Sequence, residues 1–125
     1  MRFIPTRIHG ILDYLMGALL IALPWLLGFA AGGAATWVPV VLGAALIVYS
    51  LLTDYELGVV KVIGMTAHLW LDAIGGLFLG LAPWIFGFEE LGPPAEAFWL
   101  LGFIEIAAAL LTRTAPSYRA AGGSA

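Results

Sequence analysis

The fold is decided by one stretch of sequence, HGILDYLMGALLIALPWLLGF at residues 9–29, because the chain repeats it. Residues 68–88 read HLWLDAIGGLFLGLAPWIFGF, and the two stretches share His, Leu, Asp, Gly, Leu, Pro, Trp, Gly and Phe at matching positions. The offset of 59 residues makes His9 the counterpart of His68. An internal repeat indicates a structural unit that occurs more than once in the fold. We therefore expect two copies of one helical hairpin.

The composition is that of a membrane protein. Hydrophobic residues make up 62% of the chain and charged residues 10%, whereas soluble domains are about 25% charged. The mean hydropathy is +1.03. Four apolar stretches, each near the ~20 residues that cross a bilayer, lie at 8–29, 37–52, 65–88 and 95–111. Because lipid offers no partners for backbone amides, these stretches must be helices, and we predict an all-α membrane protein with four transmembrane helices.

The repeat also predicts the domain organisation. Residues 1–125 are expected to form a single membrane domain, with repeat one at about 4–53 and repeat two at about 63–112. Because each repeat contributes an even number of spans, the two hairpins insert in the same direction and are parallel-related. Residues 113–125 are small, polar and glycine-rich, which predicts a flexible C-terminal tail.

A cleavable signal peptide is the competing interpretation of the N-terminus. Basic residues precede its apolar run and small residues follow it, as in a secretory signal. The twin of this run lies deep in the chain, and the polar side chains of His9 and Asp13 do not suit a signal's apolar region. We therefore expect the first helix to be retained.

The charges predict how the chain is oriented. Every basic residue falls in the N-terminal, central or C-terminal segment, which share one side: Arg2, Arg7, Lys61, Arg113 and Arg119. By the positive-inside rule, both termini should be cytoplasmic. The chain has no cysteine, which excludes disulfides and thiolate metal sites. It has neither a phosphate-binding loop nor a basic patch, so no nucleic-acid partner is predicted.

A Pro-Trp pair followed by Gly-Phe closes the first helix of each repeat. These residues are Pro24, Trp25, Gly28 and Phe29 in repeat one, and Pro83, Trp84, Gly87 and Phe88 in repeat two. The chain resembles the SPW-repeat membrane proteins of prokaryotes over nearly its whole length. The serine of that motif is replaced by Leu23 and Ala82, so no role of a hydroxyl is carried over. The resemblance implies a plasma (inner) membrane location and no assigned activity.

The two prolines lie inside their helices, where each removes an amide donor and crowds the preceding turn. We expect both helices to bend at the same depth, near their outer ends. The two neighbouring tryptophans fall at the outer interface, where indoles favour the headgroup level.

The first helix of each repeat carries polar groups and glycines on one face. At about 100° per residue, this face holds His9, Asp13, Gly17, Leu20, Pro24 and Gly28, and their counterparts His68, Asp72, Gly76, Leu79, Pro83 and Gly87. Glycines allow close helix approach and polar groups bond across interfaces, so helix packing is the favoured interpretation. The two imidazoles and two carboxylates are alternatively suited to bind a divalent metal, relay protons or ligate a haem. No cofactor is predicted, and a metal is left open.

Glu105 is the one charge expected near mid-membrane, and its counterpart in the repeat is Leu46. A central acid costs on the order of 2.5 kcal/mol or more. Counting along the third helix places Gly75 or Gly76 at its depth, so a glycine gap is expected to admit the carboxyl group. A protonated acid bonded to a neighbour and a substrate or proton site are both compatible with this position.

Two classes of function remain. The favoured one is a structural or interaction unit in the lipid bilayer, either a homo-oligomer or an accessory subunit of a membrane complex. The alternative is a small transporter, channel or ligand- or ion-binding protein that uses the His/Asp pairs and Glu105. No recognisable reaction centre is present, so we do not expect an enzyme.

Overall fold

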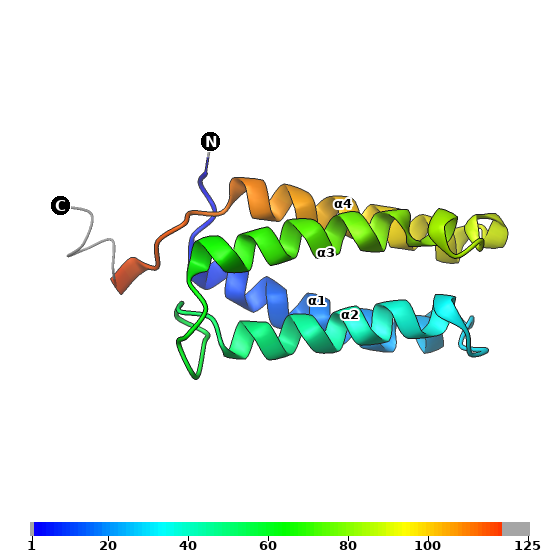
Figure 1. Ribbon diagram of the computed structural model, residues 1–125, viewed down its shortest axis with the longest axis horizontal. Coiled ribbons are helices and arrows are strands. Elements are labelled where there is room, and N and C mark those ends of the chain that lie inside the picture. The colour runs from blue at the N-terminus through cyan, green and yellow to red at the C-terminus, as the bar shows by residue number, and fades with distance from the viewer. Residues whose placement is uncertain (1, 119–125) are drawn as a thin grey trace.

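The computed structural model describes residues 2–118, and this part of the chain forms four long helices (Figure 1). They are α1 (Thr6–Leu26), α2 (Ala34–Leu51), α3 (Met65–Ile85) and α4 (Pro93–Leu111), with a short 3₁₀ helix, η1 (Glu89–Leu91), before α4. Each long helix is long and apolar enough to cross a membrane. The predicted all-α membrane fold is confirmed, and the helix limits differ from the predicted ones by at most three residues.

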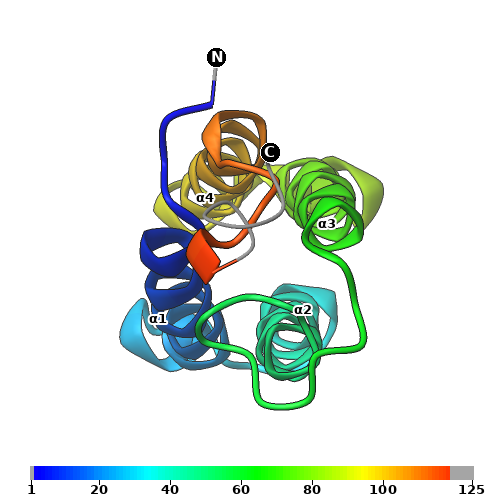
Figure 2. The same cartoon turned by 90° about the vertical axis from the view of Figure 1, so that its left-hand side faces the viewer.

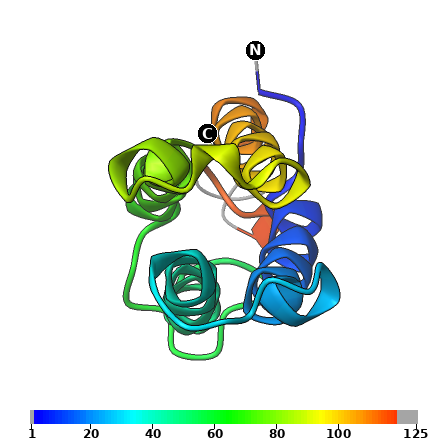
Figure 3. The same cartoon turned by 90° about the vertical axis from the view of Figure 1, so that its right-hand side faces the viewer.

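The helices form two hairpins that lie side by side and point the same way. α1 packs extensively on α2 and α3 on α4, whereas α2 and α3 touch much less. Figure 2 shows the four helices at the corners of a square, with α1 diagonal to α3. Figure 3, from the opposite end, shows the short connection that closes each hairpin. The parallel-related hairpins are therefore confirmed.

Within each hairpin the helices approach closely at a pair of glycines. A Cβ on Gly17 would lie 3.0 Å from the carbonyl oxygen of Gly43, and one on Gly76 would lie 2.8 Å from that of Gly102. Gly43 and Gly102 are counterparts in the repeat. These glycines therefore allow close helix contact inside each hairpin rather than between the hairpins. The glycines of the predicted face thus have a different role from its polar side chains.

The repeated Pro-Trp and Gly-Phe residues form the C-terminal ends of α1 and α3. Gly28 has a φ of +72°, and the N–H of Phe29 donates to the carbonyl of Pro24 at 2.8 Å. The counterparts at the end of α3 are Gly87, with a φ of +75°, and Phe88 and Pro83, which bond at 2.7 Å. This is the Schellman arrangement, in which glycine takes the left-handed conformation. It ends both helices three residues before the predicted limits.

Each proline is the third residue from the end of its helix. The bends expected at Pro24 and Pro83 stay a prediction. Trp25 and Trp84, which follow them, are exposed on the outer surface, as suits side chains at a membrane interface.

At the opposite end of the bundle, the start of each hairpin pairs with the end of the other. Ile4 forms a parallel bridge with Thr112, and Ile63 forms one with Thr53. The N–H groups of Ile4 and Ile63 donate to the carbonyls of Leu111 and Leu52 at 3.0 and 2.8 Å. We call these two reciprocal pairings the clasp; Figure 2 shows residues 2–5 passing alongside α4. The clasp joins the two hairpins at the end that carries the basic residues.

The expected flexible tail begins with residues that bond to the central connection, residues 52–64 between α2 and α3. The N–H and hydroxyl of Ser117 donate to the Glu56 carboxylate at 2.8 and 2.5 Å, and the hydroxyl of Thr6 donates to it at 2.6 Å. Tyr118 bonds to Asp54. Partial burial opposes ionisation of Glu56, but the bonds from Ser117 and Thr6 outweigh it and lower the pKa to about 2. The remainder of the tail, 119–125, lies outside the described residues.

Candidate functional site

The two His/Asp pairs meet on the axis of the bundle. His9 and Asp13 come from α1 and His68 and Asp72 from the diagonal helix α3, and none is more than 2% exposed. A spacing of four residues places the His and Asp of each helix on one face. We call these four side chains the quartet.

Each acid of the quartet lies between the two imidazoles. Across the hairpins, His9 Nε2 is 2.6 Å from Asp72 Oδ2 and His68 Nε2 is 2.9 Å from Asp13 Oδ2. Within the helices, the His9–Asp13 and His68–Asp72 contacts are 3.1 and 3.2 Å. The imidazole rings pack edge to face with centroids 5.5 Å apart. The quartet is therefore a closed ring of alternating imidazoles and carboxylates.

Two threonines of the clasp fix the orientation of the imidazoles. Thr112 Oγ1 lies 2.7 Å from His9 Nδ1, and Thr53 Oγ1 lies 2.7 Å from His68 Nδ1. Each threonine hydroxyl donates its hydrogen to the carbonyl four residues earlier, at 2.6 Å. A hydroxyl has one hydrogen, so the threonine oxygen must accept from an Nδ1–H. Both imidazoles consequently carry a proton on Nδ1 and turn Nε2 toward the acids.

Two tyrosines complete the surroundings of the acids. The hydroxyl of Tyr49 donates to Asp72 Oδ1 at 2.5 Å, and that of Tyr55 donates to Asp13 Oδ2 at 2.7 Å. Burial, together with the nearby Asp13 carboxylate, raises the pKa of Tyr55 above its usual value. Tyr55 therefore remains a hydrogen-bond donor.

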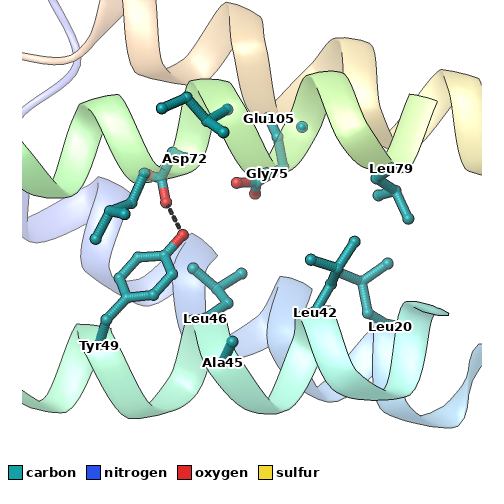
Figure 4. A pocket seen from close by; sticks show the side chains of 12 residues that line it. Leu20, Leu42, Ala45, Leu46, Tyr49, Asp72, Gly75, Leu79 and Glu105 are labelled. Carbon is teal, nitrogen blue, oxygen red and sulfur yellow. Dashed lines mark hydrogen bonds between the residues drawn. The ribbon is translucent and has the colours of Figure 1, made fainter. Parts of the chain in front are cut away.

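Glu105 lies beside the quartet, where two cavities between the hairpins meet. A cavity of about 270 Å³ between α2 and α3 and one of about 190 Å³ between α1 and α4 are both lined by Glu105. Figure 4 shows its carboxyl group pointing from α4 into the larger cavity. A Cβ on Gly76 would lie 2.9 Å from the Cβ of Glu105, so the two residues adjoin, as the depth count predicts. Among residues 2–118 this carboxyl group has no hydrogen-bond partner.

The quartet can chemically hold a cation or share protons. One ligand atom from each of its four residues lies within 4.8 Å of all the others. His68 Nε2 is fully buried, yet neither of its carboxylate contacts has the geometry of a hydrogen bond. The edge-to-face packing of the imidazoles leaves no flat gap between the rings, which is unfavourable for a haem.

Comparison with protein families matches residues 7–116 to the SPW repeat domain. The chain belongs to the SPW repeat family. The match includes the quartet, both clasp threonines and Glu105. No curated protein and no solved structure matches the chain. With its four membrane-spanning helices, this SPW repeat protein is a small multi-pass membrane protein.

The sequence indicated the quartet but not the residues that hold it. The two clasp threonines have the repeat offset of 59 residues, so extending the repeat comparison to Thr53 and Thr112 would have found them. Tyr49 and Tyr55 have no tyrosine counterparts, so the repeat carries no signal for either. Tyr49 reaches Asp72 from α2, and the contact of Tyr55 with Asp13 depends on how the connection between α2 and α3 folds over α1.

Proposed function

We propose that this SPW repeat protein is a structural and interaction unit of the prokaryotic plasma membrane, with both termini in the cytoplasm. The observation that carries the proposal is that the quartet and the clasp threonines bond from one hairpin to the other. Such interhelical bonds contribute about 0.6–2 kcal/mol each in membranes. The buried polar chemistry is thus used to hold the hairpins together. The orientation is supported by the basic residues at the clasp end.

A groove on the outer face of α3 and α4 supports association with a second copy. It has a volume of about 270 Å³ and is lined by Gly76, Leu77, Gly80, Leu81, Trp84, Trp99, Phe103 and Ile106. Gly76 and Gly80 pack against Gly102 of α4 and form the floor of the groove, and the large apolar side chains at its sides offer packing surface to a helix from another subunit. The counterpart of Gly80 is Ile21, so repeat one does not offer the same small residue at this position. The asymmetry favours one interaction face per chain.

The absence of cysteine from the sequence makes cross-linking a direct test. Leu81→Cys places a single thiol in the groove, and Val41→Cys places one on the exposed face of α2 as a matched control. With a short thiol cross-linker in native membranes, we expect a dimer-sized band for Leu81→Cys and little for Val41→Cys. Equal cross-linking at both positions, or none at position 81, would contradict association through the groove.

A second candidate function is supported by the position of Glu105. Both cavities between the hairpins reach its unpartnered carboxyl group, which is the arrangement expected of an ion or proton site. The test is proton and cation flux in proteoliposomes, with Glu105→Gln as the comparison. Flux that exceeds that of protein-free vesicles and is lost in Glu105→Gln would favour transport over the structural role. The proposal otherwise assigns the chain no reaction.

A further inference from the structure

We infer that the quartet is a binding site for a divalent transition-metal ion such as Zn²⁺, held by Nε2 of His9 and His68 and by carboxylate oxygens of Asp13 and Asp72. This inference goes beyond the structural role proposed above and can fail independently of it.

The ligand atoms of the quartet lie close enough together to surround one ion. The four contacts between imidazole nitrogens and carboxylate oxygens measure 2.6, 2.9, 3.1 and 3.2 Å. In a tetrahedral zinc site with bonds of about 2.0–2.1 Å, neighbouring ligand atoms are about 3.3 Å apart. The carboxylates must therefore move away from the imidazoles by less than about 1 Å at each contact, where Asp13 presents Oδ1 to His9 and Oδ2 to His68. Opposite ligand atoms, which lie within 4.8 Å of each other, must approach by up to about 1.5 Å, and the adjoining cavities allow the side chains to move.

The two imidazoles are already oriented for binding a metal ion. Thr53 and Thr112 each accept an Nδ1–H, which leaves Nε2 as the atom that faces the acids. Histidine ligands of metal ions are generally oriented in this way, with the other ring nitrogen bonded to a protein acceptor. The hydroxyl groups of Tyr49 and Tyr55 likewise orient the two carboxylates by donating hydrogen bonds to them. The site therefore has supporting residues behind all four ligands.

The environment of His68 Nε2 also favours a bound cation. The side chain is 0% exposed, and this nitrogen has no hydrogen-bond partner even though two carboxylate oxygens lie 2.9 and 3.2 Å away. A proton on the atom would be buried without an acceptor in line, which is unfavourable. If His68 Nε2 is unprotonated, its lone pair can instead bind a cation that lies between the carboxylates, and no buried donor is left without an acceptor. At His68 the geometry therefore favours a shared cation over a charged imidazole, whereas His9 Nε2 lies at hydrogen-bond distance, 2.6 Å, from Asp72 Oδ2.

Charge and ligand type identify the class of ion. Two carboxylates and two neutral imidazoles carry a net charge of −2, which one divalent cation neutralises in a buried site. Imidazole nitrogen suits Zn²⁺ and Fe²⁺, and the carboxylates exclude none of the first-row divalent ions. The close, four-ligand cluster is typical of the tetrahedral coordination of Zn²⁺. Co²⁺ adopts the same coordination and gives visible absorption.

The test uses the full-length chain in detergent, purified through an affinity tag without histidines and stripped with a chelator. Titration with Co²⁺ should give the visible bands of tetrahedral coordination at about one ion per chain, and Zn²⁺ should displace the Co²⁺. A wild-type chain that takes up neither ion stoichiometrically would overturn the inference, because the quartet would then be closed by protons alone.

Two double variants locate the ion. Asp13→Asn with Asp72→Asn should abolish binding, whereas Glu89→Gln with Glu90→Gln removes the same charge from exposed residues of η1 and should leave it unchanged. If the first variant does not fold, Thr53→Val with Thr112→Val retains all four ligands and should weaken binding about 10- to 100-fold. Wild-type affinity in the aspartate variant, or in the threonine variant, would place the ion elsewhere. Cross-linking at position 81 reports on the structural role separately.

Discussion

Replacing Gly76 by alanine tests whether α3 and α4 are held at backbone contact. The added Cβ would lie 2.8 Å from the carbonyl oxygen of Gly102 and 2.9 Å from the Cβ of Glu105. Neither atom is at the flexible end of a side chain, so the helices themselves would have to move apart. The adjacent Gly75 is a matched control, because a Cβ there meets nothing within 4 Å.

The two substitutions share one contribution to the free energy of unfolding and differ in another, so comparing them isolates the packing cost. Alanine is more favourable than glycine in a helix by about 0.8–1 kcal/mol, and this gain applies at both positions. Only Gly76→Ala adds overpacking, which costs about 1–3 kcal/mol. We therefore expect the free energy of unfolding of Gly76→Ala to be lower than that of Gly75→Ala by about 1–3 kcal/mol. This is about a 5- to 160-fold change in the unfolding equilibrium.

The measurement is unfolding of the two variants by SDS in mixed micelles, followed by tryptophan fluorescence. Gly76→Ala should unfold at a lower SDS fraction than Gly75→Ala. If the two variants unfold at the same SDS fraction, α3 and α4 are not in backbone contact at this glycine, and the packing argument fails.

Topology reporters fused near Lys61 should report the cytoplasm, and reporters in the connection between α3 and α4, residues 86–92, should report the outside; the reverse result would contradict the assigned orientation. The bonds to Glu56, whose pKa is lowered, should stabilise the docked 113–118 segment fully above about pH 4.5 and progressively less as the pH falls toward 2. Limited proteolysis of this segment should therefore accelerate below pH 4.5, and unchanged cleavage down to pH 2 would be inconsistent with this role. Gly87→Ala should cost about 1–2 kcal/mol because φ is +75°, whereas Gly64→Ala, at φ −64°, should cost little. Equal SDS midpoints for these two variants would contradict the helix-end interpretation.

Much of the fold could be predicted because membrane helices leave a strong signal. Residues 9–29 and their repeat set the number, direction and pairing of the helices, since lipid permits few other structures. The exact helix ends could not be predicted from hydropathy, because Gly28 and Gly87 stop the helices inside the apolar runs. Backbone conformation, rather than polarity, determines these ends.

The candidate site was predictable only in part. The four-residue spacing of His9 and Asp13, repeated in the second copy, is visible in the sequence and indicates side chains on one face. That the two copies face each other depends on α1 and α3 being diagonal, which a sequence pattern does not specify. The hydrogen bond from Tyr55 to Asp13 depends on a loop conformation, and the sequence around Tyr55 contains no pattern that predicts it.

The cavities around Glu105 are the least predictable part of the molecule. The depth count placed the residue beside a glycine, but the open space on both sides arises from the way the hairpins meet. How closely the two hairpins pack against each other cannot be read from the amino-acid composition of either hairpin. Such space becomes visible only when the four helices are assembled.

Because the clasp pairs the start of one hairpin with the end of the other, it can be completed only late in synthesis. Ile4 leaves the ribosome before its partner Thr112, which is made more than a hundred residues later. At about 5–20 residues per second, Asp72 follows His9 by roughly 3–13 s, and Thr112 follows later still. During that interval His9 lacks both Thr112 and Asp72, so a polar group stands unsatisfied in a newly inserted helix. Until the second hairpin is inserted, the polar side chain of His9 therefore depends on the insertion machinery or on neighbouring lipid headgroups for hydrogen-bond partners.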